Sequence, residues 1–133
     1  MNQDTILNLM ISHHAFLEVL FTSFKDEAKS KTERARSTLS ELTWEMKKHF
    51  FAEESAIFDF PPLKIAGVWV IIEQLKKEHV IMLESLQNFS DNLNNIKDGE
   101  IEDFYNLLES HRKIEELNLY PKLDSDLQST DKV

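Results

Sequence analysis

Four stretches of the chain repeat apolar residues at alternating intervals of three and four. Residues at these intervals share one face of an α-helix, so each stretch predicts an amphipathic helix that packs against its neighbours. The predicted helices cover approximately residues 5–26, 32–58, 65–95 and 101–120. Only two glycines and three prolines occur in 133 residues, which indicates few and short connections. The pattern predicts an all-α fold, an antiparallel up-down-up-down four-helix bundle.

The length and composition limit the class of protein further. We expect one domain over residues 1–122 and a polar C-terminal tail over residues 123–133 that frays. The absence of cysteine excludes disulfides and thiolate-bound metals. A net charge of −9 argues against a nucleic-acid partner. The N-terminus has no basic leader and no uninterrupted apolar run reaches membrane-spanning length, so we predict a cytoplasmic protein without a membrane partner.

Polar residues interrupt the apolar stripe of every predicted helix. Each helix has one histidine in its stripe, and the second and fourth helices add a glutamate four residues later. The six residues are His14, His49, Glu53, His79, His111 and Glu115. A histidine and a glutamate four residues apart lie only about 40° from each other around a helix. The pattern of histidine, then His-x-x-x-Glu-Glu, then proline occurs in both halves, which predicts two similar helical hairpins about a pseudo-two-fold axis.

Six such residues at similar depth predict a metal site. A single histidine in a helix stripe is usually a hydrogen-bonded core residue, whereas burying an unpaired carboxylate costs several kcal/mol. Imidazole and carboxylate ligands together suit iron, manganese or zinc. Six ligands exceed the tetrahedral shell of one zinc ion and fit two metals bridged by two carboxylates. Such a pair would keep open positions for dioxygen, nitric oxide or peroxide.

Several neighbouring polar residues receive other interpretations. His13 lies one residue off the stripe, so we read it as a flanking residue rather than a ligand. Glu54 and Glu116 also lie off the stripe and are expected to be solvated on the bundle surface or to make helix-surface pairs. Tyr120 is a packing residue whose hydroxyl would lie near one mouth of the bundle.

The sequence resembles the hemerythrin-like, or HHE cation-binding, domains over about residues 5–121. The resemblance rests on four segments that include the candidate ligands: Leu9-Met10-Ile11-Ser12-His13-His14, His49-x-x-x-Glu53-Glu54, Glu78-His79 and His111-x-x-x-Glu115-Glu116. It implies a four-helix bundle that holds two iron ions joined by an oxo or hydroxo bridge. Carried over to this chain, it implies one iron on His14 and His49 and the other on His79 and His111, with both motif glutamates bridging.

The chain departs from the oxygen-carrying members of that family at one position. Those proteins have a further histidine one turn from the third-helix ligand, where this chain has Leu75 and Leu83. It is therefore more similar to the four-histidine, two-glutamate members, which are associated with sensing, iron handling or responses to nitric oxide and oxidants.

We therefore expect a di-iron protein that binds or senses a small ligand, and we favour binding over catalytic turnover. The alternatives are a metal-dependent regulatory module with a protein partner, an iron-handling protein, and a di-iron peroxidase or oxidase. A metal-free structural bundle is the remaining interpretation, and it predicts that His79→Ala is tolerated.

Overall fold

The computed structural model describes residues 5–31, 33–58 and 67–131, with side chains through residue 125. Its helices are α1 (Ile6–Lys29), α2 (Arg34–Ala52), α3 (Val68–Asp91), α4 (Asp98–Ile114) and α5 (Tyr120–Asp131). Short segments of other helix types follow three of them: η1 (Glu53–Ile57) and η3 (Glu115–Leu119) are π-helical, and η2 (Leu93–Asn95) is a 3-10 turn.

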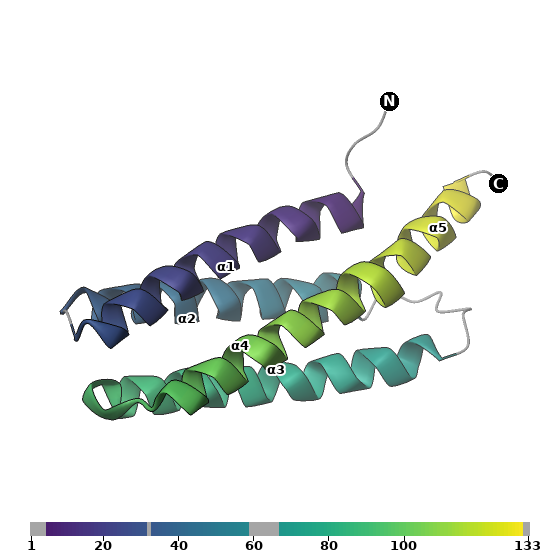
Figure 1. Ribbon diagram of the computed structural model, residues 1–133. Helices are drawn as coiled ribbons and strands as arrows, with labels where there is room; N and C mark the ends of the chain where they lie inside the picture. The colour runs from purple at the N-terminus through teal and green to yellow at the C-terminus, as the bar shows by residue number, and fades with distance from the viewer. Residues whose placement is uncertain (1–4, 32, 59–66, 132–133) are drawn as a thin grey trace.

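The elements form the predicted four-helix bundle. Helices α4 and α5 join through η3 into one long rod beside α1, α2 and α3 (Figure 1). The α1–α2 turn and the α3–α4 turn lie at the same end of the molecule, and the start of α1 and the end of α5 lie toward the other end (Figure 1). Helix α1 packs on α2 and α5, and α3 packs on α2 and α4. The all-α, up-down-up-down arrangement of two hairpins is confirmed.

Two apolar clusters fill the bundle and leave a polar layer between them. The turn-end cluster is larger and consists of Leu17, Phe21, Phe24, Ala35, Leu39, Leu42, Met46, Phe50, Met82, Leu86, Phe89, Ile101, Phe104 and Leu108. The open-end cluster lies toward the termini and consists of Met10, Phe58, Val68, Ile72, Leu75, Leu119, Tyr120 and Leu123. These clusters contain most of the predicted stripe residues, so the three- and four-residue spacing located the core correctly.

The two π-helical segments were not predicted from the sequence. In η1 the backbone N–H of Phe58 donates to the carbonyl of Glu53 at 2.7 Å, five residues back. The N–H of Tyr120 makes the equivalent bond to Glu115 in η3. Each segment adds one residue to a helical turn and shifts the inward-facing positions, so that Phe58 and Tyr120 are fully buried. Ala56, which the regular spacing places in the core, is exposed for the same reason.

The last helix does not end before Pro121, contrary to the sequence-based expectation. The chain stays helical through η3 and α5 to Asp131, with Pro121 as the second residue of α5. The i→i−5 hydrogen bond of the π turn ends at Tyr120, and Pro121, which has no N–H, follows directly where the α-helical hydrogen bonding resumes. Leu123 is buried, and the Asp124 carboxylate accepts hydrogen bonds from the N–H groups of Ile6 and Leu7 at 3.0 and 3.1 Å. These residues of the predicted tail therefore hold the start of α1, while fraying of the last residues remains a prediction.

Asp124→Ala should destabilise the bundle, because it removes an anion and two hydrogen-bond acceptors from the N-terminus of α1. We expect a loss of about 1 kcal/mol in the free energy of unfolding, measured by denaturant titration. Asp103→Ala on the exposed side of α4 is the matched control and should change little. Equal stability of the two variants would show that α5 does not hold α1 in solution.

Helix α1 is long and apolar enough, by length and composition alone, to cross a membrane. Core helices of bundles also pass that test, and in this structure Leu17, Phe21 and Phe24 of α1 are buried against the other helices.

Candidate metal centre

All six predicted site residues lie together in the polar layer between the two apolar clusters. The helices α1, α2, α3 and α4 each contribute one histidine, while Glu53 begins η1 and Glu115 begins η3. The six are buried, and the exposed fraction of both glutamates is 0%. A fully buried carboxylate pair is costly without positive charge nearby, so the layer has the character of a cation site.

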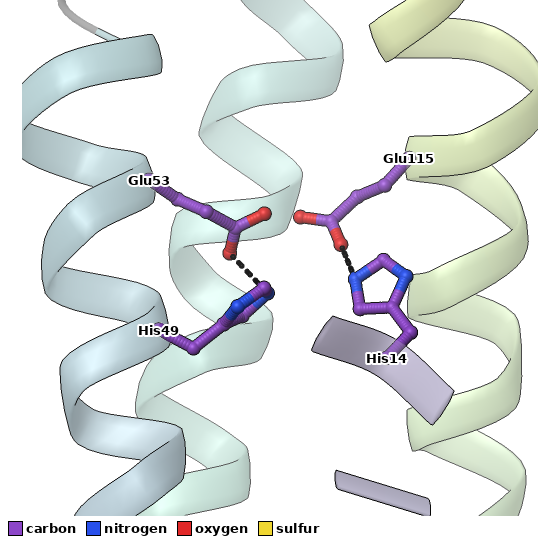
Figure 2. Close-up of side chains that lie close together, drawn as sticks. All are labelled: His14, His49, Glu53 and Glu115. Carbon is purple, nitrogen blue, oxygen red and sulfur yellow. Dashed lines mark ion pairs between the residues drawn. The ribbon is translucent and has the colours of Figure 1, made fainter. Parts of the chain in front are cut away.

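The two glutamates face each other from opposite sides of the bundle, with their carboxylates meeting at its centre (Figure 2). The Nε2 atom of His14 lies 3.0 Å from Oε1 of Glu115, and Nε2 of His49 lies 3.5 Å from Oε1 of Glu53 (Figure 2). One of these pairs joins two helices, and the other spans a single turn of one helix.

The other two histidines approach the same carboxylates. His79 Nε2 lies 3.1 Å from Oε1 of Glu53, and His111 Nε2 lies 3.3 Å from Oε2 of Glu115. Potential ligand atoms therefore form two groups in which all members lie within 4.8 Å of one another. The first position is formed by His14, His49, Glu53 and Glu115, and the second position by Glu53, His79, His111 and Glu115. Both glutamates belong to both positions.

The atoms that face the centre lack hydrogen-bond partners within the described part of the chain. They are Nε2 of His14, His49, His79 and His111, Oε1 of Glu53, and both carboxylate oxygens of Glu115. Buried polar atoms are normally hydrogen-bonded, and a group of them left without partners at one point requires an explanation. Because imidazole nitrogens and carboxylate oxygens all offer lone pairs, bound cations would satisfy the whole set.

Burial and mutual repulsion give the two carboxyl groups opposite protonation behaviour. Burial, together with the nearby charge of Glu115, raises the pKa of Glu53 well above its usual range. Burial also disfavours charge on Glu115, but its close approach to Glu53, His111 and His14 holds its pKa well below the usual range. Bound cations would favour the deprotonated form of both carboxyl groups.

The histidines differ in the same way. Burial lowers the pKa of His49 to about 3 and also lowers the pKa of His79, so both are neutral and can offer a lone pair. Burial opposes charge on His111 as well, but the carboxylates of Glu115 and Glu78 outweigh it and raise its pKa to about 9. Metal binding at His111 would therefore release a further proton.

Three outer carboxylates hold the opposite edge of the imidazole rings. The Nδ1 atoms of His14, His79 and His111 each lie 2.7 Å from one carboxylate oxygen, and the partners are Glu116, Glu54 and Glu78 respectively. Carboxylates in this position orient a ligating imidazole and increase its basicity. The expected helix-surface pair exists for Glu116, which binds Arg112 on its own helix. The contact of Glu54 and of Glu116 with a histidine of the other hairpin was not predicted. The contact of Glu78 with His111 was not predicted. The available signal was that Glu78 directly precedes the candidate ligand His79, which keeps this carboxylate close to the site.

Two further side chains adjoin the site. The Tyr120 hydroxyl donates a hydrogen bond to Oε2 of Glu53, so it lies beside the buried carboxylates and not at a mouth of the bundle, where it was expected. His13 is exposed, and its ring centroid lies 5.5 Å from that of His49 in an edge-on arrangement. His13 is therefore a flanking residue, as expected.

Comparison with known proteins agrees with this geometry. Comparisons with curated proteins and with solved structures gave no significant match. The family model described as the hemerythrin HHE cation binding domain matches residues 5–123, which is nearly the whole chain and includes all six site residues. The chain belongs to the hemerythrin HHE cation-binding domain family.

Proposed function

We propose that this protein holds two iron ions, bridged by Glu53 and Glu115, and binds dioxygen, nitric oxide or peroxide there. The observation that supports this most strongly is the pair of overlapping four-residue groups that share both buried carboxylates. A single ion would leave one pair of histidines without a partner, whereas two ions use all six residues. Manganese or zinc has the same ligand preferences and could occupy the site in place of iron.

The protein's own residues prepare this site in three ways. The outer carboxylates fix the imidazole rings with Nε2 directed at the centre. Tyr120 holds one oxygen of Glu53 by its hydroxyl, which leaves Oε1 directed at the histidines. The apolar clusters on both sides keep bulk water away. When bound, an iron pair would supply open coordination positions and electrons for a small oxidising or diatomic ligand.

A small hollow beside the site limits the size of that ligand. Three imidazoles line it, those of His14, His49 and His111, and Leu17, Phe50 and Leu108 form its apolar wall. Its volume of about 10 Å³ is close to the least that holds one water molecule. Such a space favours a ligand of very few atoms over an organic substrate.

Leu108→Phe should slow ligand binding without removing the metals, because the larger ring fills the hollow and Leu108 is not a candidate ligand. We expect the rate of nitric oxide binding, followed by stopped-flow absorption, to fall by about tenfold or more while stability changes by about 1–3 kcal/mol. Leu86→Phe, elsewhere in the turn-end cluster, provides the matched overpacking control. Equal rates in both variants would mean that ligands reach the site by another route.

The proposal is tested by metal analysis combined with optical spectra under air, under nitrogen and with nitric oxide. We expect about two irons per chain and charge-transfer bands that change with the gas. A folded protein that binds no transition metal would refute the proposal.

A further inference from the structure

The two metal positions have unequal outer support, and the difference lies at one pair of histidines. His14 and His79 are equivalent in the two hairpins, and each has a carboxylate at Nδ1 supplied by the opposite hairpin. His49 and His111 are also equivalent, since each begins a His-x-x-x-Glu-Glu motif. Only one of them has an anionic partner at Nδ1 among the described residues.

His111 is firmly held. Its Nδ1 lies 2.7 Å from Oε1 of Glu78, and Oε2 of Glu78 accepts a hydrogen bond from Nε2 of Gln74 at 3.0 Å. The carboxylate is therefore fixed on both of its oxygens.

His49 has no such support. Its Nδ1 is buried and has no hydrogen-bond partner in residues 5–31, 33–58 and 67–125. The residue in the place of Glu78 is His13, since both immediately precede the histidine of the first helix in their hairpin. His13 lies beside the His49 ring, with 5.5 Å between the ring centroids, but it offers an imidazole where Glu78 offers a carboxylate.

The carboxylate behind His14, the other histidine of the first position, is also partly neutralised. Glu116, the partner of His14, accepts a hydrogen bond from Nη1 of Arg112 at 2.9 Å, so a cation offsets its negative charge. Neither Glu54 nor Glu78 has an ion pair with lysine or arginine among those found in the described residues. An anion behind an imidazole strengthens its bond to a metal, and removing such a partner typically costs about 10- to 100-fold in affinity.

We propose that the two metals bind with different affinities, the tight one between His79 and His111 and the labile one between His14 and His49. His13 is then the residue that makes the first position weak, because it replaces a carboxylate. This inference rests on the proposed two-metal site and adds an order of filling. It also identifies the first position, which lines the hollow with both of its histidines, as the one that gains or loses its metal more readily.

The test is an anaerobic titration of metal-free protein with cobalt(II), followed by visible absorption in competition with a chelator. Wild-type protein should fill in two steps whose dissociation constants differ by about 10- to 100-fold. His13→Glu should tighten metal binding in the weaker step, which fills the position of His14 and His49, and should bring the two dissociation constants together. Glu78→Gln should weaken metal binding in the tighter step, which fills the position of His79 and His111, by about 10- to 100-fold.

Matched variants separate this effect from a general change in charge. Ser12→Glu adds the same acidic group one residue away on exposed α1 surface, and Glu73→Gln removes one from the exposed face of α3. Both should leave the two steps unchanged. The inference is overturned if His13→Glu behaves like Ser12→Glu, or if Glu78→Gln weakens the weaker step instead of the tighter one. Binding of no cobalt in any variant would instead refute the two-metal function itself.

Discussion

Glu115→Gln should abolish the paired metal site. Glu115 lies 3.0 Å from His14 Nε2 and 3.3 Å from His111 Nε2, so it belongs to both positions at once. Glutamine keeps the volume of the side chain but removes the charge that balances the cations. We expect metal content after loading and desalting to fall from about two per chain to below one, with a loss of more than about 100-fold in affinity.

The control for this prediction is Glu84→Gln, which removes the same charge from an exposed position on α3. It should retain both metals. Circular dichroism on both variants would establish that they fold. If Glu115→Gln retained two metals with unchanged affinity, Glu115 would not be a bridging ligand.

His79→Ala should remove most of the stability that metal loading adds. His79 is almost fully buried and stacks on Phe50 at 3.8 Å between ring centroids, so truncation also leaves a cavity that weakens the metal-free protein. The informative quantity is therefore the gain in free energy of unfolding on adding metal. Metal at about 100 times its Kd should add about 2.7 kcal/mol per position in the wild type. We expect the variant to lose at least half of that gain in denaturant titrations.

His13→Ala is the matched histidine control, because His13 is exposed and belongs to neither group of potential ligand atoms. It should keep the full metal-dependent gain. A metal-free structural bundle predicts no gain in any of the three proteins, and an unchanged gain in His79→Ala would exclude this residue as a ligand.

The core and the inner site were predictable because both depend on a single helix period. The spacing of Leu17, Phe21 and Phe24 locates the buried face of α1, and His14 lies on that same face. The resemblance to a known family then supplied the pairing of ligands across helices, which spacing alone does not give.

The errors arose where contacts between helices decide the outcome. Glu54 lies about 100° around the helix from Glu53, so its own helix places it toward the surface. Only the position of α3 brings His79 within 2.7 Å of it. The π turns also depend on contacts between helices. An extra residue in the turn lets Phe58 and Tyr120 be buried against other helices, and helix propensity does not predict it. The same turn lets the chain continue past Pro121, which the sequence marked as a stop.

The central claim is that two metals share Glu53 and Glu115, and magnetic measurement of the iron-loaded protein tests it most directly. Two ferric ions joined by common bridges couple their spins, so the oxidised protein should contain about two irons per chain yet show almost no electron paramagnetic resonance signal. The signal of isolated ferric ions, with a spin count equal to the iron content, would contradict a bridged pair.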